Sequence, residues 1–229
     1  MPTPIRGISS MATRAVLAEL CAAWRERSGV EVTLEATGGV DAAGRVAAGE
    51  AFDVVVLAAD AIDKLGGAGH VVAGSRVDLV RSPVAVAVRA GAPRPDVSSE
   101  AALREVVRNA RSVGFSTGPS GVFLQQLFER WGLAAELEGR LVQARPGVPV
   151  GRLVAEGRCE LGFQQLAELM HEPGVDVLGL LPGAIAHVTT FSGALAVTST
   201  QVDAVRAWLA YASSPETAEV KRRHGMEPA

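Results

Sequence analysis

The sequence lacks the features that mark several common functional classes. Its basic residues are scattered and its formal net charge is −3, so a nucleic-acid-binding role has no support. No apolar run approaches the length of a transmembrane helix. The opening "MPTPIRGISS" shows no basic segment followed by a long apolar stretch, which a secretory signal would need. We therefore expect a cytoplasmic protein as the sequence stands, or a periplasmic one if a signal segment has been removed.

Cysteines and catalytic motifs are also scarce. Cys21 and Cys159 are the two cysteines, each within an apolar or helical pattern, and we expect two buried reduced thiols. Because neither a CxxC nor a Cys/His cluster occurs, we expect no metal site and no cofactor. GxSxG is absent, and "TGPSG" lacks the lysine of a P-loop. The motifs of serine hydrolases and of nucleotide-binding loops are thus missing.

Aromatic residues make up 4% of the chain, so the core must come largely from Val, Leu and Ala. Such a core suits helices packed on a sheet. Alternation predicts a strand over 31–37, and a continuous apolar run predicts a buried strand over 52–59. Helical patterns precede and separate these strands, and they end near Gly29 and Gly49. This order predicts parallel strands with right-handed crossovers.

A second unit of similar size begins near Ser82. Strands are predicted at the start of 82–96 and over 112–117 and 159–165. Helical patterns alternate with them, one of which starts at a serine cap in "SSEAALREVV" and another at "VFLQQLFERWG". We therefore predict an α/β fold of two Rossmann-like lobes, with open, mostly parallel sheets and a ligand cleft between the lobes.

Four short polar stretches follow predicted strands, and three of them also open a helix. Ligands bind at the carboxyl edge of open parallel sheets, and helix N-termini there attract anions. Each stretch alone is more simply a helix cap or a turn, so their shared position carries the prediction of an anion site. The candidate residues are Ser9, Ser10, Thr37, Gly38, Gly39, Ser116, Thr117, Ser120, Gly121, Gln164 and Gln165.

An ordered set of segments resembles a known family across essentially the whole chain. The segments are "ISSMA", "ATGGVDAAGRVAAGEAFDVVVLAAD", "STGPSGVFLQQLFERWG", "PGVPVGRLVAEGRCELGFQQL" and "SSPETAEVKRRHGMEP". They resemble the type 2 periplasmic substrate-binding proteins, and within them the molybdate-binding components of ABC transporters. The resemblance implies one lobe at residues 1–82 plus 190–229 and a second at 83–189, with an oxyanion in the cleft.

The resemblance also implies specific ligand contacts. The family's contact positions fall on Ser10, Gly38-Gly39, Ser120 and the backbone of Val148. The tyrosine that closes the cleft in molybdate binders falls near Gln165. Two departures, "TGG" in place of a serine-rich loop and "GFQQ" in place of the tyrosine, favour a small organic carboxylate over molybdate. Arg81 and Arg145 are candidates to pair with carboxylates, with a solvated surface role as the alternative for each.

Two hypotheses remain open from the sequence. The first is a binding protein that takes a small anion and, if exported, passes it to an ABC transporter permease. The second is an enzyme on the same scaffold, an isomerase of an unsaturated di- or tricarboxylate that resembles aconitate isomerase. Such chemistry needs a base, and His187 is the histidine nearest to the predicted cleft, although a lone histidine is more often structural. No nucleic acid or membrane partner is expected.

Overall fold

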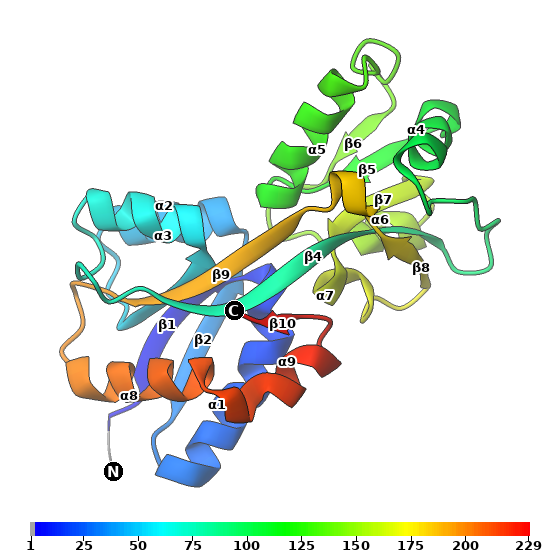
Figure 1. Cartoon of the computed structure of the whole chain (residues 1–229). Coiled ribbons are helices and arrows are strands. Elements are labelled where there is room, and N and C mark those ends of the chain that lie inside the picture. Colours follow the sequence, from blue (N-terminus) through cyan, green and yellow to red (C-terminus); the bar gives the residue numbers. More distant parts are fainter. Residues whose placement is uncertain (1–2) are drawn as a thin grey trace. The chain divides into compact units, whose positions relative to one another are not determined.

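The fold is described from a computed structural model that covers residues 3–229 (Figure 1). The chain divides into two compact units. Unit 1 comprises residues 1–82 and 190–229, and unit 2 comprises residues 83–189. Unit 2 is therefore an insertion into unit 1, and the chain crosses between the units at two places.

Unit 1 is built on a sheet whose order is β2-β1-β3-β9. The first three strands pair in parallel, and β9 pairs antiparallel to β3. Helices α2 and α3 lie on one face of this sheet, and α1 and α8 lie on the other (Figure 1). The bounds are β1 (Ile5–Ser10), α1 (Arg14–Ser28), β2 (Val32–Thr37), α2 (Gly39–Ala47), β3 (Val54–Ala58), α3 (Ala59–Gly67), β9 (Val188–Leu195), α8 (Val202–Ser213), α9 (Ala218–Arg223) and β10 (Glu227–Pro228).

Two glycines end the first helices of unit 1. Gly29 and Gly49 have φ angles of +72° and +82°, the left-handed region in which a side chain is strained. Each directs the chain into the following strand, as the sequence predicts. Between α2, α3 and the sheet lies a core of aliphatic residues that includes Ile8, Val55 and Leu57, all fully buried. This core holds β1 in place, and the candidate residue Ser10 ends that strand.

Unit 2 repeats the arrangement with the order β4-β7-β5-β6. Strands β7, β5 and β6 are parallel, and β4 pairs antiparallel to β7 and β8. Even-numbered residues of β4 pack against α4 and α5, whereas Ala85 and Ala87 pack against α7. The bounds are β4 (Val77–Arg89), α4 (Glu100–Asn109), β5 (Val113–Phe115), α5 (Pro119–Arg130), β6 (Leu141–Gln143), α6 (Val150–Ala155), β7 (Leu161–Gln165), α7 (Leu166–Leu169) and β8 (Val175–Leu180).

Strand β4 is longer than the sequence predicts, because it begins at Val77 and runs unbroken through Ser82 and Pro83. A proline inside a strand usually ends the ladder, since it has no N–H to donate. Here Val80 and Arg81 pair with β10, and the pairing with β7 starts at Val84. Pro83 thus lies where the strand changes partners, a point at which the missing donor breaks no bond of either ladder.

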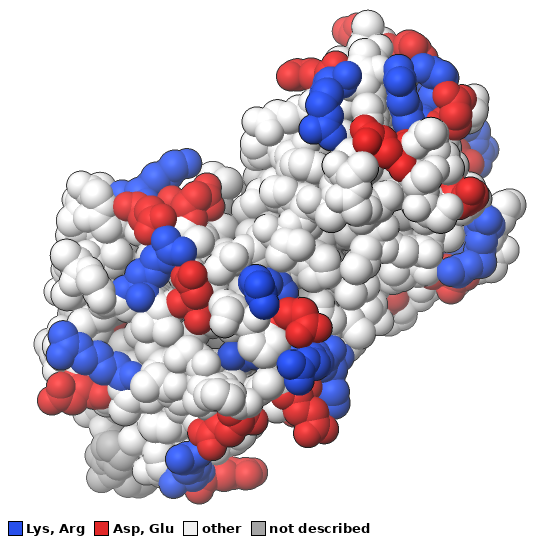
Figure 2. Space-filling view, in the orientation of Figure 1, with Lys and Arg blue, Asp and Glu red and all other residues white. Residues whose placement is uncertain are grey.

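The predicted α/β class with open sheets is confirmed, with antiparallel strands added to each parallel set. Within residues 3–229, no helix combines the length and the apolar character that a membrane crossing requires. Acidic and basic side chains are interspersed on the visible face, with no broad field of one sign (Figure 2). Cys21 and Cys159 are both buried and free.

Candidate anion-binding site

In unit 1, Ser10 lies beside the first residues of α2. It is the last residue of β1 and is 8% exposed. A Cβ atom built on Gly39 would lie 4.0 Å from the Ser10 hydroxyl oxygen, so the hydroxyl faces the start of α2 at close range. The same oxygen accepts a hydrogen bond from the Ala12 N–H at 3.4 Å and caps the short 3₁₀ turn Met11–Thr13. The structure therefore brings together Ser10 and Gly39, two of the candidate residues.

The start of α2 has no side-chain cap. Gly38 occupies the N-cap position and offers no side-chain acceptor, so first-turn N–H groups stay open to a ligand or to water. Thr37 contributes less than its position suggests, because its hydroxyl donates to an Asp41 carboxylate oxygen at 2.9 Å. The donors that remain on this side are the backbone of α2 and the hydroxyl of Ser10.

Ser9 does not join this group. Successive residues of a strand point to opposite faces of the sheet, and Ser9 faces α1 whereas Ser10 faces α2. The Ser9 side chain is 1% exposed, and its hydroxyl has no hydrogen-bond partner in the structure. It lines a separate pocket between α1 and β2. The placement of both serines in one site is therefore wrong, because the alternation of β1 separates them.

Arg81 contacts the C-terminal segment of the chain. Its Nε donates to the backbone oxygen of Pro228 at 3.1 Å, and its backbone pairs with Glu227. This contact holds the guanidinium group near β10. Within residues 3–229, no hydrogen bond or ion pair joins the Arg81 side chain to another candidate residue.

In unit 2, the candidate serines meet at the start of α5. The hydroxyl oxygens of Ser116 and Ser120 are 3.1 Å apart, and the Ser116 oxygen also accepts from the Gly118 N–H at 3.2 Å. Because one hydroxyl donates to the other, one proton of the pair stays free to donate to an anion. Thr117 lies in the same turn and is half-buried.

Helix α5 begins earlier than the sequence predicts. It starts at Pro119, so Ser120 and Gly121 lie in its first turn and not in the preceding loop. Proline suits this position because its fixed φ is helical and its missing N–H would have no partner there. Gly121 is required by packing, since a Cβ at this position would lie 1.7 Å from the carbonyl oxygen of Ser116.

Gln164 stabilises unit 2 from within. Its side-chain oxygen accepts from the backbone N–H groups of Val150 at 2.8 Å and Gly151 at 3.3 Å, and its amide donates to Glu168 at 2.7 Å. The N-terminus of α6 is therefore already occupied by an acceptor. Val148 is likewise engaged, because its N–H donates to the carbonyl of Arg145 at 3.0 Å. In this structure the Val148 donor and the Gln164 side chain are thus both engaged within the protein, and the ligand contacts expected of them stay predictions.

Gln165 keeps one unsatisfied atom. Its amide nitrogen donates to the Thr189 hydroxyl at 2.8 Å, whereas its buried side-chain oxygen has no hydrogen-bond partner among residues 3–229. A buried polar atom without a partner is costly, so a donor from a ligand or a water would be favoured here. Sequence reasoning did not identify Thr189, because nothing in its local pattern links it to a glutamine 24 residues earlier in the chain.

His187 lies two residues before Thr189. Its imidazole stacks on the ring of Phe123, with ring centroids 4.1 Å apart and planes inclined by 14°. Burial lowers the pKa of His187 below its ordinary value of 6.5, so the ring is neutral at pH 7 and able to accept a proton. Phe123, in the first turns of α5, was not predicted as a site residue, since an apolar helix position carries no functional signal.

Comparisons with known proteins show the family and the fold of the chain. Residues 5–227 match the family described as bacterial extracellular solute-binding protein. An aconitate isomerase of a Pseudomonas species is 38% identical over 234 residues, which cover 99% of this chain and 88% of that protein. The periplasmic molybdate-binding protein of Azotobacter vinelandii has a TM-score of 0.80 at 17% identity, with 97% of this chain and 98% of that chain covered.

A sulfate-binding protein of Mycobacterium tuberculosis has a similar fold. Its TM-score is 0.79 at 17% identity, and the match covers 100% of this chain and 88% of that chain. At such identities the likeness concerns the fold. The resemblance to type 2 periplasmic substrate-binding proteins that the sequence indicates is confirmed.

Proposed function

Because the chain belongs to the family of bacterial extracellular solute-binding proteins, we propose that it binds a small organic anion with two or three carboxylates. The observation that carries the proposal is the uncapped start of α2 beside the Ser10 hydroxyl. Backbone N–H groups at a helix start, together with a hydroxyl, suit a carboxylate oxygen. In an exported form, the anion would pass to a transporter permease.

Two features favour an organic acid over a tetrahedral oxyanion. The loop at Thr37, Gly38 and Gly39 has fewer hydroxyl donors than the serine-rich loop of molybdate binders. Its one hydroxyl, that of Thr37, donates to Asp41. In unit 2, the start of α6 is filled by Gln164, which removes further backbone donors. A tetrahedral oxyanion gathers its donors around one centre, whereas the donors that remain here form two separate groups, the α2 backbone with Ser10 and Ser116 with Ser120, each of which suits one carboxylate. The 38% identical relative is named for an organic tricarboxylate.

Isothermal titration tests this proposal. The ligands are citrate, cis-aconitate, trans-aconitate, succinate, sulfate, phosphate, molybdate and tungstate. We expect at least one carboxylate to bind more tightly than every inorganic anion. Ser10→Ala should weaken that carboxylate roughly tenfold or more, because it removes a hydrogen bond to a charged group. Ser9→Ala is the matched control and should leave the affinity unchanged, since its side chain points to the other face.

The Ser116–Ser120 pair supplies an independent test in unit 2. Ser120→Ala should weaken the same carboxylate by a similar factor. Binding of molybdate alone, or a carboxylate affinity that neither Ser10→Ala nor Ser120→Ala changes, would overturn the proposal.

A second function, isomerisation of an unsaturated tricarboxylate, is favoured by the relative named aconitate isomerase and by the neutral His187. In such a reaction a base removes a proton from one carbon, the double bond shifts, and a proton is added at the far end of the three-carbon unit. His187 is the proposed base. Proton NMR of cis- and trans-aconitate in heavy water would follow both isomerisation and deuterium uptake.

The His187→Gln variant separates the two functions. If the chain is an isomerase that uses His187, the variant should lose turnover and still bind the acid in the titration. Unchanged turnover in His187→Gln would exclude this residue as the base. Absence of deuterium uptake and of isomerisation in the unaltered protein would leave binding as the function.

A further inference from the structure

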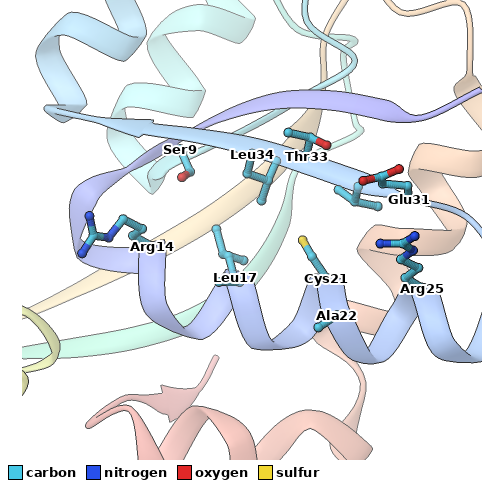
Figure 3. Close-up of a pocket in the computed structure, with 11 residues that line it drawn as sticks. Ser9, Arg14, Leu17, Cys21, Ala22, Arg25, Glu31, Thr33 and Leu34 are labelled. Atoms are coloured by element: carbon cyan, nitrogen blue, oxygen red, sulfur yellow. The ribbon is translucent and has the colours of Figure 1, made fainter.

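Unit 1 contains a pocket that the proposed anion site does not use. It has a volume of about 310 Å³ and lies between α1 and β2, the strand at the edge of the sheet. Figure 3 shows Ser9 and Arg14 near one end of this pocket and Arg25 and Glu31 near the other. The two arginines are eleven positions apart on α1, which corresponds to roughly 16 Å along the helix axis.

The middle of the pocket is apolar. Leu17 and Cys21 from α1 and Val32 and Leu34 from β2 line it, and Ala18 on the exposed side of α1 leaves room at the rim. Burial raises the pKa of Cys21 to about 12, so its thiol carries no charge at neutral pH. An alkyl chain is the kind of group that such a surface removes from water.

Polar groups without partners stand at one end of the pocket. Ser9 is 1% exposed, lines the pocket, and its hydroxyl makes no hydrogen bond in the structure. Arg14 is exposed, and within residues 3–229 its guanidinium has no ion-pair partner. Figure 3 draws the Arg14 guanidinium directed away from Ser9, and the exposed side chain would turn toward the pocket so that the guanidinium and the hydroxyl bind one carboxylate, which would satisfy the buried hydroxyl.

The other end of the pocket argues against a second negative group on the ligand. There Glu31 lines the pocket at the same end as Arg25, so a carboxylate of the protein would repel a second negative group of the ligand (Figure 3). A ligand with one carboxylate and an apolar tail matches this distribution of charge. A dicarboxylate or a long cation does not.

We infer that this pocket binds a medium-chain monocarboxylate, with the carboxylate at Ser9 and Arg14 and the alkyl chain along Leu17 and Leu34. The site is separate from the anion site at Ser10, because Ser9 and Ser10 face opposite sides of the sheet. The inference therefore does not depend on the proposed function, and either one can fail without the other.

Titration calorimetry with sodium decanoate, below the concentration at which it forms micelles, tests the inference on the full chain. Decanoate should bind with one site, and decanol and decyltrimethylammonium should bind at least roughly tenfold more weakly. Arg14→Gln and Ser9→Ala should each weaken decanoate roughly tenfold, since each removes a hydrogen bond to the carboxylate. Ala18→Leu should abolish binding, because the larger side chain fills the rim.

Three control variants show whether a loss of decanoate binding comes from this pocket. Ser9→Ala removes a buried hydroxyl without a partner, so it should fold at least as well as the unaltered chain. Arg206→Gln, an exposed arginine on α8 outside the pocket, should leave decanoate binding unchanged. Ser10→Ala should also leave it unchanged, whatever it does to citrate.

Equal binding of decanoate and decanol would overturn the inference, as would variants of Ser9 and Arg14 that bind normally. No binding at millimolar decanoate would overturn it as well. Sedimentation that shows a dimer in the unaltered chain, and a monomer in Ala18→Leu, would assign the pocket to a second copy of the chain instead.

Discussion

The side-chain oxygen of Gln164 lies 2.8 Å from the backbone nitrogen of Val150, at the start of α6. A side chain of the protein thus holds the position at which a helix N-terminus would otherwise meet an anion. The resemblance implies a backbone ligand contact at Val148, just before this helix, and in the structure Gln164 caps the helix from within the protein. The cap reduces the number of donors that unit 2 can offer to a ligand.

Gln164→Leu should destabilise the protein by about 1–3 kcal/mol, because the buried N–H groups of Val150 and Gly151 lose their acceptor. Urea unfolding followed by circular dichroism measures this change. Gln125→Leu, on the exposed side of α5, is the control and should change stability little. If Gln164→Leu had normal stability but no longer bound the carboxylate, Gln164 would be a ligand contact and not an internal cap.

Gly121→Ala should destabilise unit 2 by about 1–3 kcal/mol or more, because the new Cβ would lie 1.7 Å from the Ser116 carbonyl oxygen. The turn that pairs Ser116 with Ser120 would have to move. Gly118→Ala is the matched control in the same turn. Its Cβ would meet the Ser116 hydroxyl at 3.6 Å, an ordinary contact, and its φ of −81° suits alanine. Thermal melting of both variants compares them, and equal melting temperatures would contradict the packing argument.

Lys221 in α9 is fully buried, and its ammonium nitrogen has no hydrogen-bond partner in the structure. Burial lowers its pKa from 10.5 to about 8, so the folded protein binds fewer protons than the unfolded chain between these values. Stability should therefore rise with pH across the window from about 8 to 10.5.

The Lys221→Met variant isolates this contribution. It should be more stable than the unaltered chain at pH 7, and its advantage should shrink as the pH approaches 10.5. Urea unfolding at several pH values supplies the comparison. Lys64→Met, at an exposed position, should show no such pH-dependent difference. If the difference in unfolding free energy between Lys221→Met and the unaltered chain did not change with pH, burial would not lower the pKa of Lys221.

His187 gives a second pH dependence with the same sign at lower pH. Burial lowers its folded pKa below 6.5, so the unfolded chain binds more protons and stability falls as the pH drops below that value. His187→Phe can keep a stacked contact with Phe123 and removes the titrating group. The free energy of unfolding of the variant, relative to that of the unaltered chain, should be higher at pH 5 than at pH 7.5. The same difference at both pH values would show that His187 does not titrate in this window.

The fold could be predicted where local signals agree with one another. Gly29 and Gly49 end helices because a left-handed residue suits glycine, and Ser99 caps α4 by accepting from the Ala102 N–H. The first residues of β4, from Val77 to Arg81, are missing from the prediction, because their pairing with β10 at the far end of the chain is not visible in the local sequence. The start of α5 was placed three residues late, although proline at the first helical position is itself a signal.

The site was harder to predict than the fold. Side-chain alternation separates Ser9 from Ser10 because both lie within β1, whereas both are predicted to follow a strand, where alternation does not apply. The role of Gln164 could not have been found, because it depends on a contact with Val150 across 14 residues and on the exact packing of α6. The same holds for the contacts of Gln165 with Thr189 and of His187 with Phe123, which join distant parts of the chain.

Because unit 2 is inserted into unit 1, the ribosome completes unit 2 before it completes unit 1. When the ribosome has made residue 189, all of unit 2 exists, whereas unit 1 still lacks residues 190–229. Strand β3, whose five residues are all buried in the finished sheet, pairs on one side with β9, most of which has yet to be made. An apolar strand with a free edge is prone to pair with other chains. The nascent protein thus carries an exposed aggregation-prone edge from the completion of β3 at Ala58 until the ribosome has translated β9, which ends at Leu195.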